Sequence, residues 1–243
     1  MARRAVFEYD RPVSTENSLL ELVARAPLST RVHRLRFRAA SAFRWAAGQY
    51  LIVMRAGGHE LALPYSIASA CDPEHPGELE IAAAFGAGAD VIDALVPGDR
   101  IEVQGPAGEF TWQAEPRAAA LLIGVGTGIA PLRALIQEEL RRPRATRLLL
   151  LAGHRAPEDV LFADDFAELA RREPRFTFLP TLTGAHEHWI GRRGRVQAQL
   201  AEAVASLGEL DAYLCGRLDM VSEVTIALEL LGVPRARIRS EGY

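Results

Sequence analysis

The hydrophobic pattern changes its period near residue 115, and this change divides the chain into two parts with different folds. In residues 31–38, apolar and arginine side chains alternate, as in a β-strand with one buried face. Similar runs are separated by turn sequences such as Gly57-Gly58 and Pro97-Gly98. The expected strands are residues 19–25, 31–38, 49–55, 61–68, 78–85 and 100–104. Strands of this spacing predict a small antiparallel β-barrel of Greek-key type, with one short helix near residues 90–95.

After Pro116 the pattern becomes an alternation of strands and helices. The expected strands are the mostly apolar runs 118–123, 147–151, 176–179 and 211–215, with a closing strand around Ile238. Residues 132–140 carry apolar side chains at helical spacing. Pro157 is expected to open the second helix, and Gly208 and Gly232 to end the third and fourth. This part therefore predicts an α/β doubly wound nucleotide-binding domain with a five-stranded parallel sheet.

The charged residues limit the possible ligands and chemistry. The 28 basic residues are all arginine, and against 31 acidic residues they leave a net charge of −3. Without a basic surplus we expect no nucleic-acid partner. Without lysine the chain can form neither a Schiff base nor the lysine contact of a P-loop.

The cysteines and the apolar runs exclude further classes. Cys71 and Cys215 are the only cysteines, too few for a disulfide framework or for an iron–sulfur cluster held by four cysteines. No apolar run approaches the roughly 18 residues of a membrane span, and the first ten residues do not read as a signal peptide. We therefore expect a cytoplasmic protein without a membrane span.

The strongest local motif is the glycine-rich turn from Gly124 to Pro131, which follows a strand and opens a helix. Such a turn brings backbone N–H groups at a helix N-terminus close to a phosphate, although tight strand–helix packing alone would also require glycine. A dehydrogenase-type dinucleotide site would add an acid about 20 residues later, and residues 151–155 contain none. A methyltransferase would be expected to have an acid at position 122, where the chain has leucine. The turn thus predicts a phosphate-bearing ligand of another class.

Four segments in this order resemble the ferredoxin–NADP reductase superfamily, and especially its small flavin-reductase members without an iron–sulfur domain. They are Gly48-Gln49-Tyr50, residues 64–69, the Gly124 to Pro131 turn, and residues 213–220. Residues 105–110 and 189–194 are supporting matches. The resemblance implies a flavin-binding β-barrel over residues 17–114 and an NAD(P)-binding α/β domain over residues 117–243, preceded by a lead-in of residues 1–16.

The resemblance also implies which residues form the site. The flavin would contact Tyr50, Pro64, Tyr65, Ser66, Ile67, Ala68, Gly86 and Gly88. The pyridine nucleotide would contact Gly124, Gly126, Thr127, Gly128, Pro131, Arg155, Cys215, Gly216 and Met220. Four of the site residues are candidates for catalysis. Ser66 would lie near flavin N5 and Cys215 beside the nicotinamide C4. Glu241 and Tyr243 are similar to the terminal Glu-x-Tyr of plant-type reductases, in which the aromatic ring covers the flavin and the acid is a proton-relay candidate.

One position departs from the family pattern Arg-x-Tyr-Ser, whose arginine holds the flavin phosphate. This chain has Leu63 there. Arg55 or the backbone of residues 86–89 could take over that contact. FAD is the expected flavin, with FMN or riboflavin as alternatives.

The coenzyme preference rests on residues 181–185, which lack the Ser-Arg pair of NADP-specific relatives, so the sequence favours NADH over NADPH. Arg155, Arg192 and Arg193 could instead bind a 2′-phosphate. The pair His186 and His188 has no further ligand nearby in the sequence, so no metal site is expected.

These observations predict an NAD(P)H-dependent flavoprotein oxidoreductase. A hydride would move from nicotinamide to flavin N5, and the electrons would then pass to a free flavin, a redox protein or an oxygenase partner. Two alternatives stay open: an electron-transfer subunit without turnover of its own, and a degenerate member that has lost flavin and acts as a binding or regulatory module, for which Leu63 is the reason.

Overall fold

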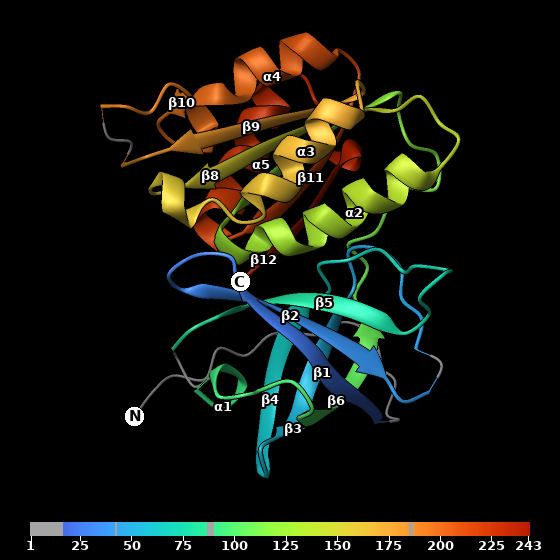
Figure 1. Cartoon of the computed structure of the whole chain (residues 1–243). Coiled ribbons are helices and arrows are strands. Elements are labelled where there is room, and N and C mark those ends of the chain that lie inside the picture. Colours follow the sequence, from blue (N-terminus) through green and yellow to red (C-terminus); the bar gives the residue numbers. More distant parts are fainter. Residues whose placement is uncertain (1–16, 42, 87–89, 185–186) are drawn as a thin grey trace.

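Two six-stranded sheets, one antiparallel and one parallel, form the two halves of the computed structural model (Figure 1). The structure describes residues 17–41, 43–86, 90–184 and 187–243. The expected lead-in of residues 1–16, Gly88 and His186 therefore lie outside the described residues.

The antiparallel sheet has the strand order β4-β3-β6-β1-β2-β5. Its strands are β1 (Ser18–Pro27), β2 (Val32–Ala39), β3 (Tyr50–Ala56), β4 (His59–Ser66), β5 (Glu78–Ala84) and β6 (Arg100–Ala107). A bridge between Ile67 and Ile81 joins the end of β4 to β5 and closes the sheet toward a barrel. Apolar side chains from alternate strand positions, among them Phe37 and Val103, fill its interior. The predicted barrel is confirmed, including the short helix α1 (Asp90–Asp93).

The second sheet is parallel, with the order β10-β9-β8-β7-β11-β12. Its strands are β7 (Ala119–Val125), β8 (Arg147–His154), β9 (Phe176–Leu182), β10 (Arg192–Arg193), β11 (Asp211–Gly216) and β12 (Ile238–Gly242). The five predicted strands are present, and the two-residue β10 adds a sixth. Its residues pair with Thr181 and Leu182, but two residues are too few to show a periodic pattern in the sequence.

Helices cover both faces of the parallel sheet. They are α2 (Ile129–Arg141), α3 (Ala163–Arg172), α4 (Leu200–Leu207) and α5 (Leu218–Leu230). Leu122 of β7 packs in the cluster that includes α2 and α3, whereas its neighbours Leu121 and Ile123 pack with α4 and α5. Both faces of β7 are therefore buried, which explains its uninterrupted apolar sequence.

The expected start of the second helix was wrong. Pro157 opens only a 3₁₀ turn, and α3 begins at Ala163 after Phe162 adopts a left-handed conformation with φ of 55°. Residues 160–162 are buried apolar side chains that turn the chain back onto the sheet before the helix starts. The expected helix ends are confirmed, since Gly208 and Gly232 follow α4 and α5 with positive φ.

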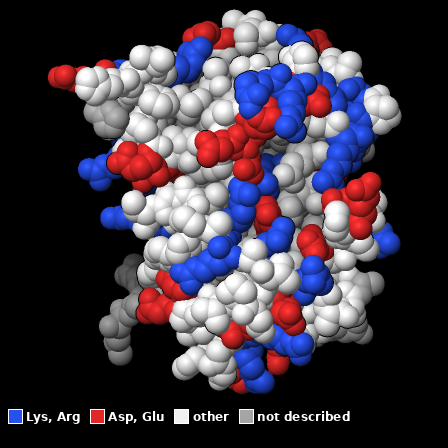
Figure 2. Space-filling view, in the orientation of Figure 1, with Lys and Arg blue, Asp and Glu red and all other residues white. Residues whose placement is uncertain are grey.

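The barrel packs against the α2 side of the parallel sheet, and β12 ends at the junction of the two halves (Figure 1). Basic and acidic side chains are interspersed over the face shown in Figure 2, so no field of one sign dominates it. Within the described residues, no helix combines the length and the apolar content needed to cross a bilayer.

Candidate active site

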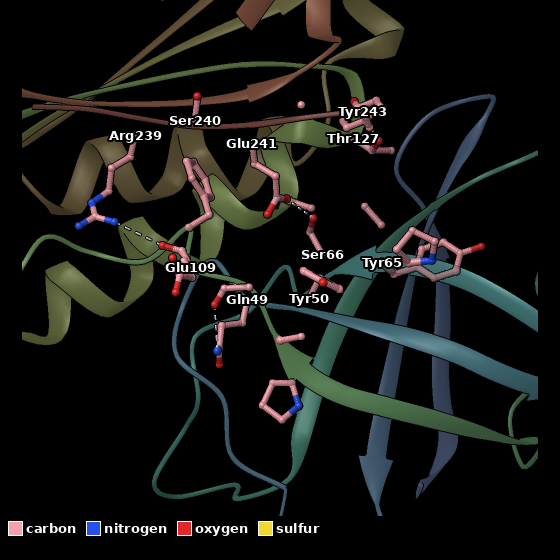
Figure 3. Close-up of a pocket in the computed structure, with 18 of the residues that line it drawn as sticks. Gln49, Tyr50, Tyr65, Ser66, Glu109, Thr127, Arg239, Ser240, Glu241 and Tyr243 are labelled. Carbon is pink, nitrogen blue, oxygen red and sulfur yellow. Dashed lines mark hydrogen bonds between the residues drawn. The ribbon is translucent and has the colours of Figure 1, made fainter. Parts of the chain in front are cut away.

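The larger cavity, of about 1010 Å³, lies at the junction between the barrel and the parallel sheet. The ends of β3 and β4, residues 106–110, Thr127 and the segment from Ser240 to Tyr243 contribute to its walls. Figure 3 shows Tyr65 and Ser66 on the barrel side and Glu241 on the opposite side. The cavity thus brings together segments that are almost 180 residues apart in the sequence.

Ser66 and Glu241 face each other across this cavity. The Ser66 hydroxyl donates a hydrogen bond of 3.3 Å to Glu241 Oε1 (Figure 3). Burial raises the pKa of Glu241 to about 7, while the bond from Ser66 acts in the opposite direction. A carboxyl group with this pKa can hold or release a proton near neutral pH, as general acid–base chemistry requires.

Tyr65 forms an aromatic wall of the cavity. Its side chain packs against the apolar interior of the barrel, and its pKa is raised to about 12 by burial and by the charge of Asp93. The phenol is therefore neutral and suited to packing against a flat ring. Together with Tyr50, Pro64 and Ser66, it lines one wall of the cavity.

Among the described residues, no cation lines the cavity beside Leu63. Leu63 itself lines the wall. Arg55 does not reach in, as the sequence had suggested it could, because its guanidinium pairs with Glu60 at 3.3 Å and Glu102 at 3.7 Å. Arg235 and Arg239 are the only basic residues among the described residues of this wall. A cationic contact to an anionic ligand in this cavity would therefore come from Arg235 or Arg239 and not from position 63.

The glycine-rich turn joins β7 to α2 through a 3₁₀ turn of residues Gly126–Gly128. Gly126 has a φ of 53°, and a Cβ at Gly128 would lie 2.3 Å from the carbonyl oxygen of Cys215. Both positions therefore require glycine. The N-terminus of α2 carries no side-chain cap, so its N–H groups are available at the turn.

The Tyr243 hydroxyl occupies this turn. It accepts hydrogen bonds from Gly128 N at 3.0 Å and Thr127 Oγ1 at 3.1 Å, and it donates to the Val125 carbonyl at 3.2 Å. Burial raises the pKa of Tyr243, and the nearby Cys215 contributes to the same shift. The sequence predicts only a stacking role for this ring, whereas in the structure its hydroxyl also has three hydrogen-bond partners.

Cys215 lies at the carboxyl end of β11, in register with Gly124 on β7 and Glu241 on β12. It is 1% exposed, and burial raises the pKa of its thiol well above the usual value, with Glu241 adding to the shift. The thiol is therefore neutral. Its contact with nicotinamide stays a prediction, because Cys215 lines neither cavity.

A second cavity, of about 770 Å³, lies on the other side of the glycine-rich turn. Arg155 and Met220 line it, as predicted for a pyridine-nucleotide site. Residues 29–32 of the barrel also contribute to its wall. Gly126 lines the second cavity and Thr127 the first, so the two cavities meet at this turn.

The structure divides the predicted site residues into three groups. The first cavity contains Tyr50, Pro64, Tyr65, Ser66, Thr127, Glu241 and Tyr243, and the second contains Gly126, Arg155 and Met220. Ile67, Ala68, Gly86, Gly124, Gly128, Pro131, Cys215 and Gly216 line neither cavity. Within this last group, Gly124 and Gly128 shape the turn through close backbone contacts.

Several lining residues were missed. Arg235 precedes β12 and Arg239 belongs to it, and both line the first cavity. Arg31, Arg195, Arg217 and four acids line the second cavity. In a chain with 28 basic residues, no sequence signal distinguishes these arginines from surface ones. No cluster of histidine, cysteine and acidic residues suitable for a metal ion occurs in the part of the chain that the structure describes.

Each half of the chain matches a known domain family. Residues 19–112 match the oxidoreductase FAD-binding domain and residues 122–225 the oxidoreductase NAD-binding domain. The chain is 36% identical over 233 residues to ferredoxin–NADP reductase B of Sorangium cellulosum, covering 91% of this chain and 96% of that protein. It is 30% identical to the NAD(P)H-flavin reductase of Vibrio harveyi, covering 80% of this chain and 84% of the relative.

Among solved structures, the Amycolatopsis cytochrome P450 reductase GcoB superposes with a TM-score of 0.84 at 28% identity, over 93% of this chain and 69% of that one. The expected cofactors, FAD and a pyridine nucleotide, agree with the two domain matches. The chain belongs to the ferredoxin–NADP reductase family of flavoprotein oxidoreductases.

Proposed function

We propose that this protein oxidises NAD(P)H by transferring a hydride from nicotinamide to the N5 atom of a bound flavin. The observation that carries the proposal is that consecutive residues of the glycine-rich turn, Gly126 and Thr127, line the second and the first cavity respectively. Hydride transfer requires two flat rings held about 3–3.5 Å apart with water excluded. A flavin in the first cavity and a nucleotide in the second can meet at this turn.

The residues of the first cavity suit a flavin ring. Tyr65 offers an aromatic surface, and Ser66 places a hydroxyl at the edge of the same wall. When bound, the flavin supplies a two-electron acceptor. The family arginine is replaced by Leu63, so position 63 supplies no cation for the flavin phosphate, and among the described wall residues only Arg235 and Arg239 could supply one.

Glu241 and Ser66 would handle the accompanying proton. With a pKa of about 7, the Glu241 carboxyl holds a proton in about half of the molecules at neutral pH. The Ser66 hydroxyl donates to Glu241 Oε1, so this bond holds the carboxyl group close to the barrel side of the cavity. We therefore assign Glu241 as a proton donor and acceptor and Ser66 as its contact to the flavin.

For the coenzyme we propose NADH. Arg192 pairs with Glu202, at 2.6 and 2.5 Å, and does not line the second cavity. Among the described residues of the second cavity's wall, arginines and acids are equal in number. The arginines are Arg31, Arg155, Arg195 and Arg217, and the acids are Glu158, Asp159, Asp219 and Glu223. A cavity without net positive charge gives no advantage to a 2′-phosphate.

We further propose that residues 17–114 and 117–243 act as the flavin-binding and NAD(P)-binding domains. The two domain matches support this division. We place the enzyme in the cytoplasm, because both cysteines are unpaired and reduced pyridine nucleotide is supplied there. The acceptor is a free flavin or a partner redox protein, as the names of its relatives suggest.

The visible spectrum of the purified protein tests the proposal. We expect flavin bands at about 375 and about 450 nm, after addition of FAD if necessary, and their loss on adding NADH. A protein that binds no FAD and oxidises no NADH with added FAD or FMN would reject it. An electron-transfer subunit without turnover would show the bands and their bleaching, but no steady-state oxidation with free flavin.

A further inference from the structure

One face of α2 carries four polar side chains that bind the backbone of the barrel. They are Arg133, Gln137, Glu138 and Arg141, which we call the α2 row. The successive spacings are four, one and three residues, which place all four on one side of the helix. The opposite side is apolar and packs against the parallel sheet. The row is thus the part of α2 that faces the other half of the molecule.

Each member of the row contacts one main-chain group. The Arg133 guanidinium donates to Ala68 O at 2.8 Å, and Arg141 donates to Cys71 O at 2.9 Å. Gln137 accepts from Ala70 N at 3.0 Å, and Glu138 accepts from Ala47 N at 3.1 Å. Three of these four groups belong to residues 68–71, which directly continue the flavin-wall segment of residues 64–66.

Arg133 is the most constrained member of the row. It is 7% exposed and also donates to Glu80 on β5 at 2.8 Å and to Asp165 on α3 at 2.7 Å. Its guanidinium lies 4.6 Å from the centre of the Phe162 ring. Arginine has five donors in a planar fork, so it can hold three acceptors at once, whereas methionine can hold none.

A second arginine, from the barrel, joins the ion pairs that Arg133 forms with Glu80 and Asp165. Arg34 on β2 donates to the same Asp165 carboxylate at 2.6 Å and lies 4.9 Å from the Phe162 ring. Two cations and two carboxylates therefore form a neutral, largely enclosed group that joins β2 and β5 to α2 and α3. Buried ion pairs contribute little to net stability but can select a single geometry.

We propose that Arg133 is a positioning residue that fixes the distance between the nicotinamide and flavin rings. The helix that carries the row begins at the glycine-rich turn, where the nucleotide would bind, and the barrel segment it holds continues from Tyr65 and Ser66. A helix is stiff over this length, so the row transmits the position of one wall to the other. This inference rests on the proposed hydride transfer.

The test is the rate of flavin reduction by saturating NADH in a single turnover. In Arg133→Met we expect this rate to fall about 10- to 100-fold, since an error of about 1 Å in ring placement costs about 100-fold. The dissociation constants for NADH and flavin should change less than about threefold. Arg133→Lys should give an intermediate rate, because an ammonium can satisfy only some of the acceptors.

Arg175→Met is the matched control. Arg175 is a partly buried arginine that donates to the carbonyls of Leu140 and Arg144 without contacting the barrel. We expect it to lower the melting temperature without lowering the reduction rate. An unchanged rate in Arg133→Met, or an equal fall in Arg175→Met, would overturn the proposal.

Hydrogen exchange of the protein without ligands gives a second measurement, independent of activity. Amides in residues 66–71 should exchange faster in Arg133→Met than in the parent, and not in Arg175→Met. If Arg133→Met does not fold, Gln137→Leu removes only the Ala70 contact and should show both effects at a smaller size, and the absence of both would overturn the proposal. A parent protein that NADH does not reduce would reject the proposed function instead, and the exchange result would still decide whether the row holds the barrel segment.

Discussion

The raised pKa of Glu241 makes a prediction about stability that involves no cofactor. In the unfolded chain this carboxyl titrates near 4.5, and in the folded protein near 7, because burial disfavours its charged form. Between these values the folded state binds more protons than the unfolded state. The unfolding free energy therefore falls as the pH rises through this window and levels off above pH 7.

The size of the effect follows from the shift. A difference of about 2.5 pKa units corresponds to about 3 kcal/mol, which is an upper limit for this partly exposed site. Glu241→Gln keeps the shape and the oxygen that accepts from Ser66, but it cannot ionise. Relative to the parent, this variant should gain up to about 3 kcal/mol between pH 4.5 and pH 8.

In the parent protein alone, the fall of the unfolding free energy with pH would be masked by a second buried group. His154 is 8% exposed, and burial lowers its pKa to about 4, so its contribution to stability rises with pH over almost the same window. When the unfolding free energy of the parent is subtracted from that of the variant, the contribution of His154 cancels, because both proteins contain this residue. Urea unfolding at several pH values, followed by tryptophan fluorescence, measures this difference.

Ser66→Ala is the control, because it keeps the Glu241 carboxyl and its burial. Compared with the parent, it should show the same or a slightly steeper fall of stability with pH, since the Ser66 bond lowers the pKa of Glu241. A difference between Glu241→Gln and the parent that stays constant from pH 4.5 to pH 8 would refute the raised pKa.

Three further predictions concern ligand binding. Tyr243→Phe removes three hydrogen bonds from the glycine-rich turn, each worth about 0.5–1.5 kcal/mol, and should tighten NADH binding several-fold in a fluorescence titration. An unchanged dissociation constant would show that the hydroxyl does not compete with the coenzyme. Leu63→Arg should tighten FMN by roughly 10- to 100-fold and leave riboflavin unchanged, and equal effects on both would place position 63 away from the phosphate. The kcat/KM for NADPH should not exceed that for NADH, and a clearly higher value would assign Arg155 and its neighbours to the 2′-phosphate.

Much of the fold could be predicted because its strands bury either one face or both. Alternation in residues 31–38 and the apolar run of β7 each follow directly from such burial. The start of α3 could not be predicted in the same way. Pro157 carries a helix-start signal, but three buried apolar residues and the left-handed Phe162 intervene before Ala163.

The candidate site was predictable where a motif is continuous in the sequence. The glycine-rich turn and residues 64–66 fall at the walls of adjoining cavities. Arg133 was missed because its partners Glu80 and Asp165 lie 53 and 32 residues away, and an arginine beside an apolar stripe normally faces water. The Tyr243 hydroxyl was missed because its partners depend on how β12 approaches the turn.

The side chain at position 63 also bears on where the electrons go. A flavin held by its ring and not by its phosphate has an affinity limited by apolar contact, and it can leave the cavity after reduction. Reduced flavin would then be the product, consistent with similarity to a flavin reductase. Arg239 could instead keep the flavin bound, because it lines the cavity and its Nε is buried without a partner among the described residues. If Arg239 binds the flavin phosphate, the flavin stays bound and a protein must collect the electrons. Arg239→Met separates the two cases: it should weaken FMN but not riboflavin if the arginine holds the phosphate, and should affect neither if the flavin exchanges freely.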